Sequence, residues 1–389
     1  MKSLNPNINN LYNLILKLTL FLGIATSPLY LLSSGSPQLS HLFLFLFSIL
    51  VLLKFGISRD KYFYFFLFFV FFCFLINIFY IYKDLFQIKF IEIKYLRVPL
   101  FLTYNFIITI SIISYFRHQK HFDLVLYGLV ISILIIFFHL IYEVFSDNLG
   151  YRYTAYYNNP NQLGYFSTCC FALVYLMYRN LYLSYNFMII FISIIFLFSI
   201  LSLSKAAIVA IGICAVFTIK PTYYKNSKII FTIISLAIIY LFIFFFDEII
   251  KTNVFFRMMN MVSESDSSLE MRGYFVFLEG NLAQFIFGLG PKNTFEFHGY
   301  EIHSTFASIL ALYGLIGVLL FSLLTFSWIF YIKNKYGLIG LICVCGPPLL
   351  YGLTHNGIRF SFFWVIFAVS LIIEINPKKI FQTINKNSV

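Results

Sequence analysis

The feature that most constrains this chain is a succession of long apolar runs separated by short polar segments. Most runs are close to the length that a helix needs to cross a membrane, about 20 residues. Lipid offers the backbone no hydrogen-bond partners, so such runs must be helical, and none alternates like a strand of an outer-membrane barrel. The expected spans are 11–32, 39–56, 62–82, 98–116, 124–145, 162–178, 186–203, 206–219, 229–246, 304–332, 336–353 and 360–375.

Composition points to the same class of protein. Hydrophobic residues make up 61% of the 389 residues and charged residues only 11%, which is too little charge to cover a water-soluble domain of this size. All six cysteines fall within apolar runs, so neither a disulfide framework nor a metal site is expected. We therefore predict one all-α polytopic membrane domain over 1–389, with about twelve transmembrane helices.

The cations concentrate in alternate loops, which predicts an orientation with both termini cytoplasmic. One loop disagrees, because 83–97 carries four cations; an interfacial amphipathic segment would explain it. The net charge of +12 is thus a topology signal, and nucleic acid is not an expected partner. In this orientation one large outer loop, 247–303, lies on the periplasmic face together with Arg152, Lys205 and Arg359.

The segment before the span at 162–178 reads Y-R-Y-T-A-Y-Y-N-N-P-N-Q-L-G and includes Arg152. Sugar faces stack on aromatic rings and sugar hydroxyls bond to amides, so this density predicts a saccharide site with Asn159 and Asn161 as binding residues. Pro160 favours a turn, after which Asn161 is expected to cap the helix. A tyrosine-rich interfacial belt is the alternative interpretation.

Two further cations are candidates for function. Lys205 follows S-L-S in an apolar stretch, where an ionisable group is a functional candidate unless its side chain simply reaches water at a hairpin tip. Arg272 opens a run that ends at F-G-L-G-P, which predicts a helix along the membrane surface terminated by the glycines. A guanidinium suits phosphate, with a solvated surface arginine as the alternative, and G-L-G alone is weak evidence of phosphate binding.

His303 stands at the start of the span that closes the outer loop. An imidazole titrates near neutral pH, so it can exchange a proton or hydrogen-bond a phosphate; a lone interfacial histidine is often only an anchor. His355 and Arg359 share the same face, and Arg359 is a further candidate for binding an anion. A carboxylate of the loop, Glu301 or Glu270, is an alternative base.

In this order, the motifs resemble those of the O-antigen polymerase and O-antigen ligase superfamily of bacterial envelope glycosyltransferases. The matching pieces are N-N-P-N-Q-L-G, S-L-S-K-A, one large outer loop with F-G-L-G, and I-H-S-T-F followed by L-Y-G-L-I-G-V-L-L-F. The likeness of architecture covers nearly the whole chain, and the motifs cover about 150–320. The resemblance implies a C-type glycosyltransferase fold, action at the periplasmic face on glycans linked to undecaprenyl pyrophosphate, inversion at the anomeric carbon, and neither a metal nor a nucleotide cofactor.

The resemblance also implies roles for residues. Arg272 matches the loop arginine proposed to hold the donor pyrophosphate, and His303 matches the histidine near the end of the loop. Lys205 stands where the ligases usually carry arginine, which keeps the charge but loses the bidentate fork. A pyrophosphate leaving group needs mainly cations and a base. We expect Arg152, Arg272 and Lys205 to stabilise its charge, and His303 or Glu301 to accept the proton of the acceptor hydroxyl.

The expected function is polymerisation of lipid-linked oligosaccharide repeat units into O-antigen or a related surface polysaccharide, in the bacterial inner membrane. The ligase that transfers finished glycan to lipid A–core in lipopolysaccharide biosynthesis is the alternative within the class. A polysaccharide flippase or other transporter is the alternative outside it, and a non-catalytic assembly subunit is a third. Expected partners are the undecaprenyl-pyrophosphate-linked glycan, membrane lipid, a chain-length regulator and a flippase.

Overall fold

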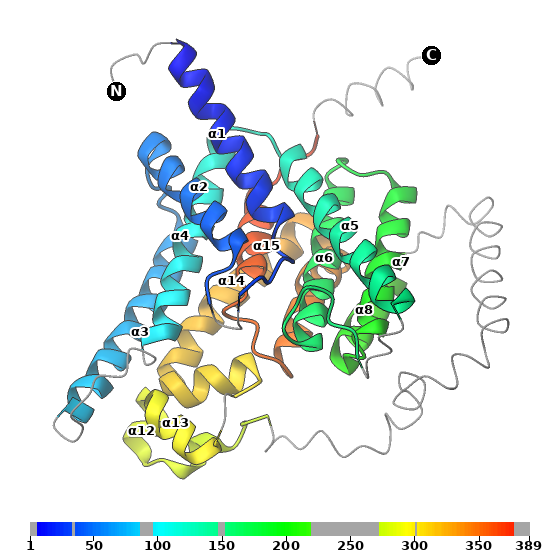
Figure 1. The fold of residues 1–389 in the computed structure, drawn as a ribbon. Coiled ribbons are helices and arrows are strands. Elements are labelled where there is room, and N and C mark those ends of the chain that lie inside the picture. Colours follow the sequence, from blue (N-terminus) through cyan, green and yellow to red (C-terminus); the bar gives the residue numbers. More distant parts are fainter. Residues whose placement is uncertain are drawn as a thin grey trace, which may run out of the picture.

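A computed structural model describes residues 6–32, 36–85, 96–146, 152–218, 272–299 and 302–376. In this part of the chain the regular structure is helical, without a strand (Figure 1). The helices are α1 (Pro6–Ala25), α2 (Leu39–Phe55), α3 (Lys61–Leu85), α4 (Arg97–His118), α5 (Asp123–Phe145), α6 (Pro160–Arg179), α7 (Tyr185–Leu201), α8 (Lys205–Val216), η3 (Val276–Glu279), α12 (Leu282–Phe287), α13 (Gly290–His298), α14 (Thr305–Gly352) and α15 (Ser361–Ile372). The expected span 229–246 lies outside the described residues; the other expected spans fall on helices.

The outer helices carry the character of a membrane protein. Among the described residues, α1, α3, α4, α5 and α14 are long and apolar enough to cross a membrane, and α2, α7, α8 and α15 are shorter apolar helices. Large apolar side chains such as Leu11, Phe68, Phe138 and Ile190 are exposed on the outside, where lipid would cover them. The all-helical membrane class is therefore confirmed, whereas the number of twelve spans stays a prediction.

Helix α14 covers 48 residues but is kinked and folds back as a hairpin. A straight helix of that length would extend about 70 Å at 1.5 Å per residue. Its two ends nevertheless meet, since a Cβ built on Gly352 would lie 3.5 Å from Thr305 Oγ1. The backbone leaves helical geometry at Gly314 and Gly337, where φ is +63° and +74°, values that glycine adopts readily. The expected ranges 304–332 and 336–353 thus fall on separate helical arms that meet near Gly337, but the first range is not one continuous helix, because the backbone breaks at Gly314.

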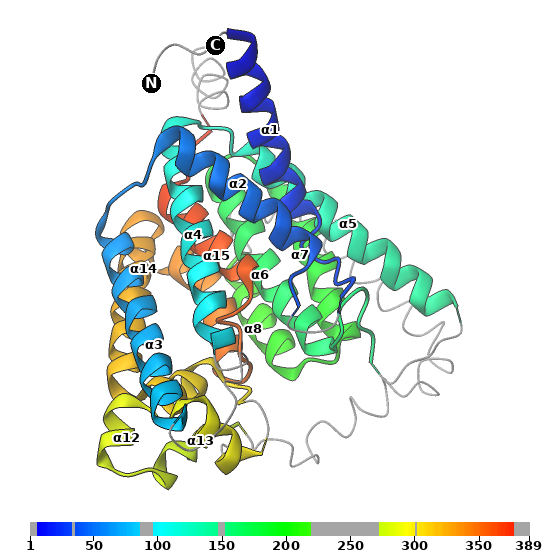
Figure 2. The ribbon, with the colours of Figure 1, turned by 60° about the vertical axis from the view of Figure 1, so that its left-hand side comes forward.

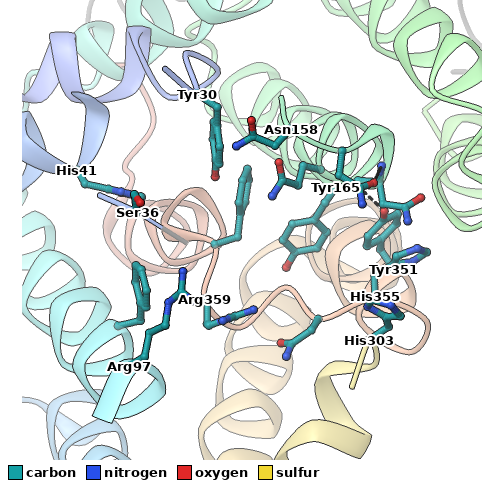
Figure 3. Close-up of a pocket in the computed structure, with 16 residues that line it drawn as sticks. Tyr30, Ser36, His41, Arg97, Asn158, Tyr165, His303, Tyr351, His355 and Arg359 are labelled. Carbon is teal, nitrogen blue, oxygen red and sulfur yellow. Dashed lines mark hydrogen bonds between the residues drawn. The ribbon is translucent and has the colours of Figure 1, made fainter. Parts of the chain in front are cut away.

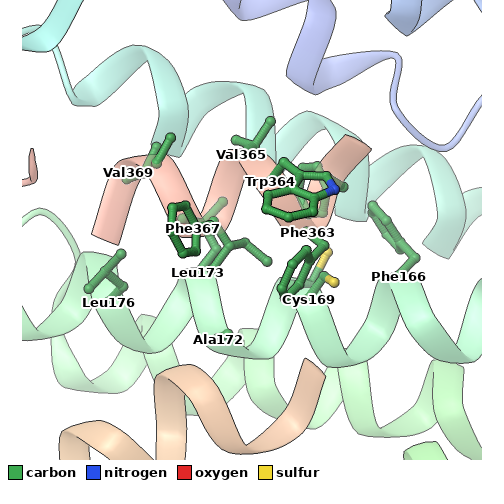
Figure 4. Packing of buried hydrophobic residues seen from close by; sticks show 14 of the residues in the cluster. Phe166, Cys169, Ala172, Leu173, Leu176, Phe363, Trp364, Val365, Phe367 and Val369 are labelled. Carbon is green, nitrogen blue, oxygen red and sulfur yellow. The ribbon is translucent and has the colours of Figure 1, made fainter. Parts of the chain in front are cut away.

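The centre of the bundle is formed by α6 and α15 (Figures 1 and 2). Every residue of α6 from Leu163 to Met177 is buried, and so is every residue of α15 from Ser361 to Leu371. Figure 4 shows the two helices packed through rings and small side chains, and the rings of Phe166 in α6 and Phe362 in α15 lie 5.4 Å apart between centroids. Because neighbouring helices surround α6, it tolerates more hydroxyl and tyrosine side chains than a lipid-facing helix would.

Two predicted helices differ from the structure. The expected span 11–32 ends at Ala25, because Pro28 lacks an amide N–H and restricts the residue before it. The predicted surface helix from Arg272 to the glycines is wrong, because Gly280 separates η3 from α12. Asn281 starts α12 with a capping box, in which its Oδ1 accepts from Gln284 N at 3.0 Å and Gln284 Oε1 accepts from Asn281 N at 3.0 Å. Only the predicted end at the glycines is confirmed, since α12 stops at Gly288 with φ of +97°.

The two ends of the bundle carry different polar groups. Helices α2, α4 and α6 run from one end, where a pocket described below opens, to the other, where their last turns carry Lys54, Arg117 and Arg179. At this second end Arg117 pairs with Asp60 at 2.8 Å and Lys54 Nζ donates to Asn13 Oδ1 at 2.6 Å. These are the loops whose cations predict the cytoplasmic side, so the pocket lies at the end predicted to be periplasmic.

Candidate functional site

A pocket of about 350 Å³ opens where α2, α4, α6 and α15 begin (Figure 3). Its volume falls within the usual range of small-molecule sites, about 300–1,000 Å³. Over the ranges that the structure describes, the lining contains two arginines, three histidines and five side-chain amides, but no carboxylate. The lining residues are Tyr30, Ser36, His41, Arg97, Phe101, Asn158, Asn159, Asn161, Gln162, Tyr165, His303, Tyr351, His355, Asn356, Arg359 and Phe360. Such a lining suits an anionic ligand that also carries hydroxyl groups.

The start of α6 supplies the amides. Asn159 caps the helix, because its Oδ1 accepts from Asn161 N at 2.8 Å, and Pro160 occupies the first turn, where no N–H is needed. The prediction that Asn161 is the cap is therefore wrong. Asn161 Oδ1 instead accepts from Arg152 Nη2 at 2.8 Å, and Arg152 Nε donates to Ser202 O at 2.9 Å. One guanidinium thus fixes the amide segment against the S-L-S turn.

The loop between α14 and α15 supplies His355, Asn356, Arg359 and Phe360 to the pocket. Thr305 anchors its middle, since Thr305 Oγ1 donates to His355 O at 3.0 Å and accepts from Gly357 N at 2.9 Å. These bonds hold the loop rigidly over the central helices.

An aromatic surface lies between the two sides of the pocket. The ring of Tyr165 lies 5.0 Å from that of Tyr351 and 5.2 Å from that of Phe360, measured between centroids. It also lies directly on Gly357, where a Cβ would come within 2.2 Å of Tyr165 Cζ. Aromatic faces flanked by amides are a surface on which a sugar ring can stack and hydrogen-bond.

One side of the pocket is lined by His303 and His355, and the guanidinium of Arg272 lies near them outside the lining. Arg272 Nη1 donates to Thr354 O, the carbonyl next to His355. Its guanidinium therefore lies near both histidines. His355 stacks on Tyr351 with centroids 4.5 Å apart, and burial followed by the charge of Arg272 lowers its pKa to about 3. Burial and Arg272 also lower the pKa of His303 below its ordinary value. Both imidazoles are therefore neutral at pH 7 and can accept hydrogen bonds or protons.

The other side carries Arg97 and Arg359, which Figure 3 shows away from His303 and His355. Burial, and after it the charge of Arg97, lowers the pKa of Arg359 to about 10, so the guanidinium of Arg359 is still charged at neutral pH. Among the described residues, Arg97 and Arg359 are thus the cations that line the pocket, and on the other side of the aromatic surface Arg272 lies near the histidines, outside the lining.

The structure brings together most of the residues predicted from the sequence. His303, Asn159, Asn161 and Arg359 line the pocket. Arg152 and Arg272 bond to the segments that line it. Their roles in binding and catalysis stay predictions.

Two predicted residues are not placed in the pocket. Lys205 is the first residue of α8 and does not line it; its turn reaches the site through Ser204, whose Oγ lies 3.4 Å from Tyr351 Oη. Glu301, like Glu270, lies outside the described residues.

Sequence reasoning missed part of the lining, notably Tyr30, His41, Arg97 and Tyr351. Only Arg97 gave a signal, because its loop contradicted the charge pattern of the others.

The F-G-L-G segment has a packing role in the structure. A Cβ on Gly288 would lie 2.2 Å from Leu312 O, and one on Gly314 would lie 2.4 Å from Gly288 N. Leu289 N donates to Ala311 O at 2.7 Å. The glycines thus let α12 approach the kink of α14, and this segment does not line the pocket.

Among the described residues, no three His, Cys, Asp or Glu side chains gather as a metal-binding group. In comparisons with known proteins, the chain matches no protein-family model and none of the curated proteins. Its function is therefore inferred from the pocket and from the sequence motifs.

Proposed function

We propose that this protein is a membrane glycosyltransferase that polymerises oligosaccharide repeat units linked to undecaprenyl pyrophosphate. The observation that carries the proposal is the pocket itself, which combines cations, neutral imidazoles, amides and stacked aromatic rings at one end of an apolar helical bundle. Cations suit the pyrophosphate, and amides with aromatic faces suit the glycan. The open end of the bundle is where the headgroup of a membrane-embedded lipid would lie.

In the proposed reaction the hydroxyl oxygen of the acceptor sugar attacks the anomeric carbon of the donor. The bond between that carbon and the pyrophosphate oxygen breaks, and the lipid pyrophosphate leaves with the electron pair. Arg272 and Arg152 stabilise the negative charge that develops on the leaving oxygen. Each positioned charge of this kind typically contributes about 100-fold or more to the rate.

The proton of the acceptor hydroxyl goes to a base at the same side of the pocket. His303 fits this role because its side chain is exposed at the pocket and its pKa is lowered, so it is unprotonated before the reaction. Glu301, two residues earlier in the chain, is the alternative base. Arg272 raises the energy of a protonated His303, and departure of the proton after transfer is correspondingly favoured.

The pocket supports an enzyme better than a transporter. It lies at one end of the bundle, where α2, α4, α6 and α15 begin, and not along a path through the membrane. Polymerase and ligase share the donor and the chemistry and differ in the acceptor. We also propose a periplasmic orientation, on the basis of the charge pattern, and a C-type glycosyltransferase fold, on the basis of the resemblance carried by the sequence motifs.

The test is the surface-polysaccharide ladder of a deletion strain that expresses wild-type protein, Arg272→Ala or His303→Ala. Arg59→Ala, which removes a cation at the other end of the bundle, is the matched control. We expect a ladder with wild type and control, and a single-repeat band with the two pocket variants. Loss of all attached glycan, with lipid-linked polymer accumulating, would identify a ligase instead. An unchanged ladder in Arg272→Ala would refute both.

A further inference from the structure

The side of the pocket that carries Arg97 and Arg359 has no part in the proposed binding of the donor pyrophosphate by Arg272 and Arg152. Arg97 comes from the start of α4 and Arg359 from the loop before α15, so two separate segments bring their guanidiniums to one place (Figure 3). The proposed donor side is lined by the two histidines, with Arg152 and Arg272 bonded to the segments that line the pocket, and Tyr165 lies between the sides with Phe360. The pocket is therefore two-ended.

The Arg359 side is rigidly built. Asn105 Nδ2 lies 3.4 Å from Arg359 O, and Trp364 Nε1 donates to the neighbouring Ile358 O at 2.7 Å. The core thus fixes the backbone on which the guanidinium is mounted. Two guanidiniums that line the same pocket can both donate to one anion, each through bidentate hydrogen bonds.

We propose that Arg97 and Arg359 form a second anion-binding subsite, which holds a phosphate or carboxylate group of the acceptor substrate. This inference rests on the proposed function, because it names what the second substrate of that reaction carries. The donor pyrophosphate lies at Arg272, the acceptor anion at Arg359, and the sugars between them stack over Tyr165. A phosphate at this subsite fits a second lipid-linked repeat unit, and a carboxylate fits an acidic sugar.

The test measures binding of inorganic pyrophosphate to the full-length protein in lipid nanodiscs. Wild type is expected to show two binding events per chain. Arg359→Gln and Arg97→Gln are expected to weaken one event by at least about tenfold, since hydrogen bonds to charged groups are worth about 1.5–3 kcal/mol. Arg272→Gln is expected to weaken the other, and Arg59→Gln to change neither.

Glucuronate then distinguishes the two sources of the anion. Competition by glucuronate for the Arg359-dependent event would identify an acidic sugar, and no competition would identify a phosphate; both results support the subsite. Arg359→Lys keeps the charge and is expected to retain binding better than Arg359→Gln, and equal thermal midpoints show that the variants are folded.

Two results would overturn the subsite. One is a single pyrophosphate event in the wild type, and the other is two events that Arg97→Gln and Arg359→Gln leave unchanged. A different result would show that the proposed function is wrong. In that case Arg272→Gln would neither weaken the pyrophosphate binding assigned to Arg272 nor change the polysaccharide ladder.

Discussion

Substitution of Gly357 by alanine tests whether the pocket is built as described. The new Cβ would lie 2.2 Å from Tyr165 Cζ and 2.4 Å from its Oη, far inside contact distance. Tyr165 is buried between Tyr351 and Phe360, so its ring cannot swing away without disturbing the aromatic surface. Overpacking of this kind costs about 1–3 kcal/mol of unfolding free energy.

The assay is equilibrium unfolding of the purified protein with a denaturing detergent. Gly212→Ala is the control, because its Cβ would meet only Phe196, at 3.8 Å, and a helical glycine gains about 0.5–1 kcal/mol on becoming alanine. Shortening Tyr165 to leucine should reduce the cost of Gly357→Ala, giving a coupling energy of about 0.5–3 kcal/mol. Unchanged stability in Gly357→Ala would mean that the loop between α14 and α15 does not pack on α6. The pocket described between them would then be wrong.

Three further predictions follow from the site and its supports. The pKa of His355 is about 3 in the fold against 6.5 in the unfolded chain, so the unfolded state binds more protons between these values. Stability should therefore fall as pH falls below 6.5, by up to about 1.4 kcal/mol per pH unit, and His355→Asn should flatten this slope in thermal melts. Gly288→Ala should destabilise far more than Gly299→Ala, because both have positive φ but only the first meets backbone; a reversed order in detergent unfolding would contradict the packing at α14. Arg152→Gln should lower stability by about 1–3 kcal/mol through its lost bonds, and it should shorten the polysaccharide ladder more than Lys205→Gln does.

Most helices were predictable because every span in lipid must be a long apolar helix that satisfies its own backbone hydrogen bonds. Apolar length alone therefore located α2 to α8, the second arm of α14 and α15 to within a few residues, but it missed the break of the first arm of α14 at Gly314. Interruptions depend on local chemistry that apolar length ignores. Pro28 ended α1 early, and Gly280 with the capping box of Asn281 divided the expected surface helix.

The candidate site was predictable where a polar residue stood out against apolar surroundings. Arg152, Asn159 and His303 could be found this way, because burying a polar side chain near a span is costly and such a residue is therefore a candidate for function. Tyr30 and Tyr351 could not, since tyrosine is common throughout this chain and only tertiary packing selects which rings face the pocket. The partner of each arginine also depends on packing, as the contact of Arg152 with the distant Ser202 carbonyl shows.

The most direct test of the account is glycan elongation by the purified full-length protein in proteoliposomes that contain lipid-linked repeat units. Glycan length and released undecaprenyl pyrophosphate are followed together by mass spectrometry. We expect wild type to lengthen the glycan and to release one lipid pyrophosphate per bond formed, and Arg272→Gln to be slower by about 100-fold or more. Elongation by Arg272→Gln at the wild-type rate would contradict this account.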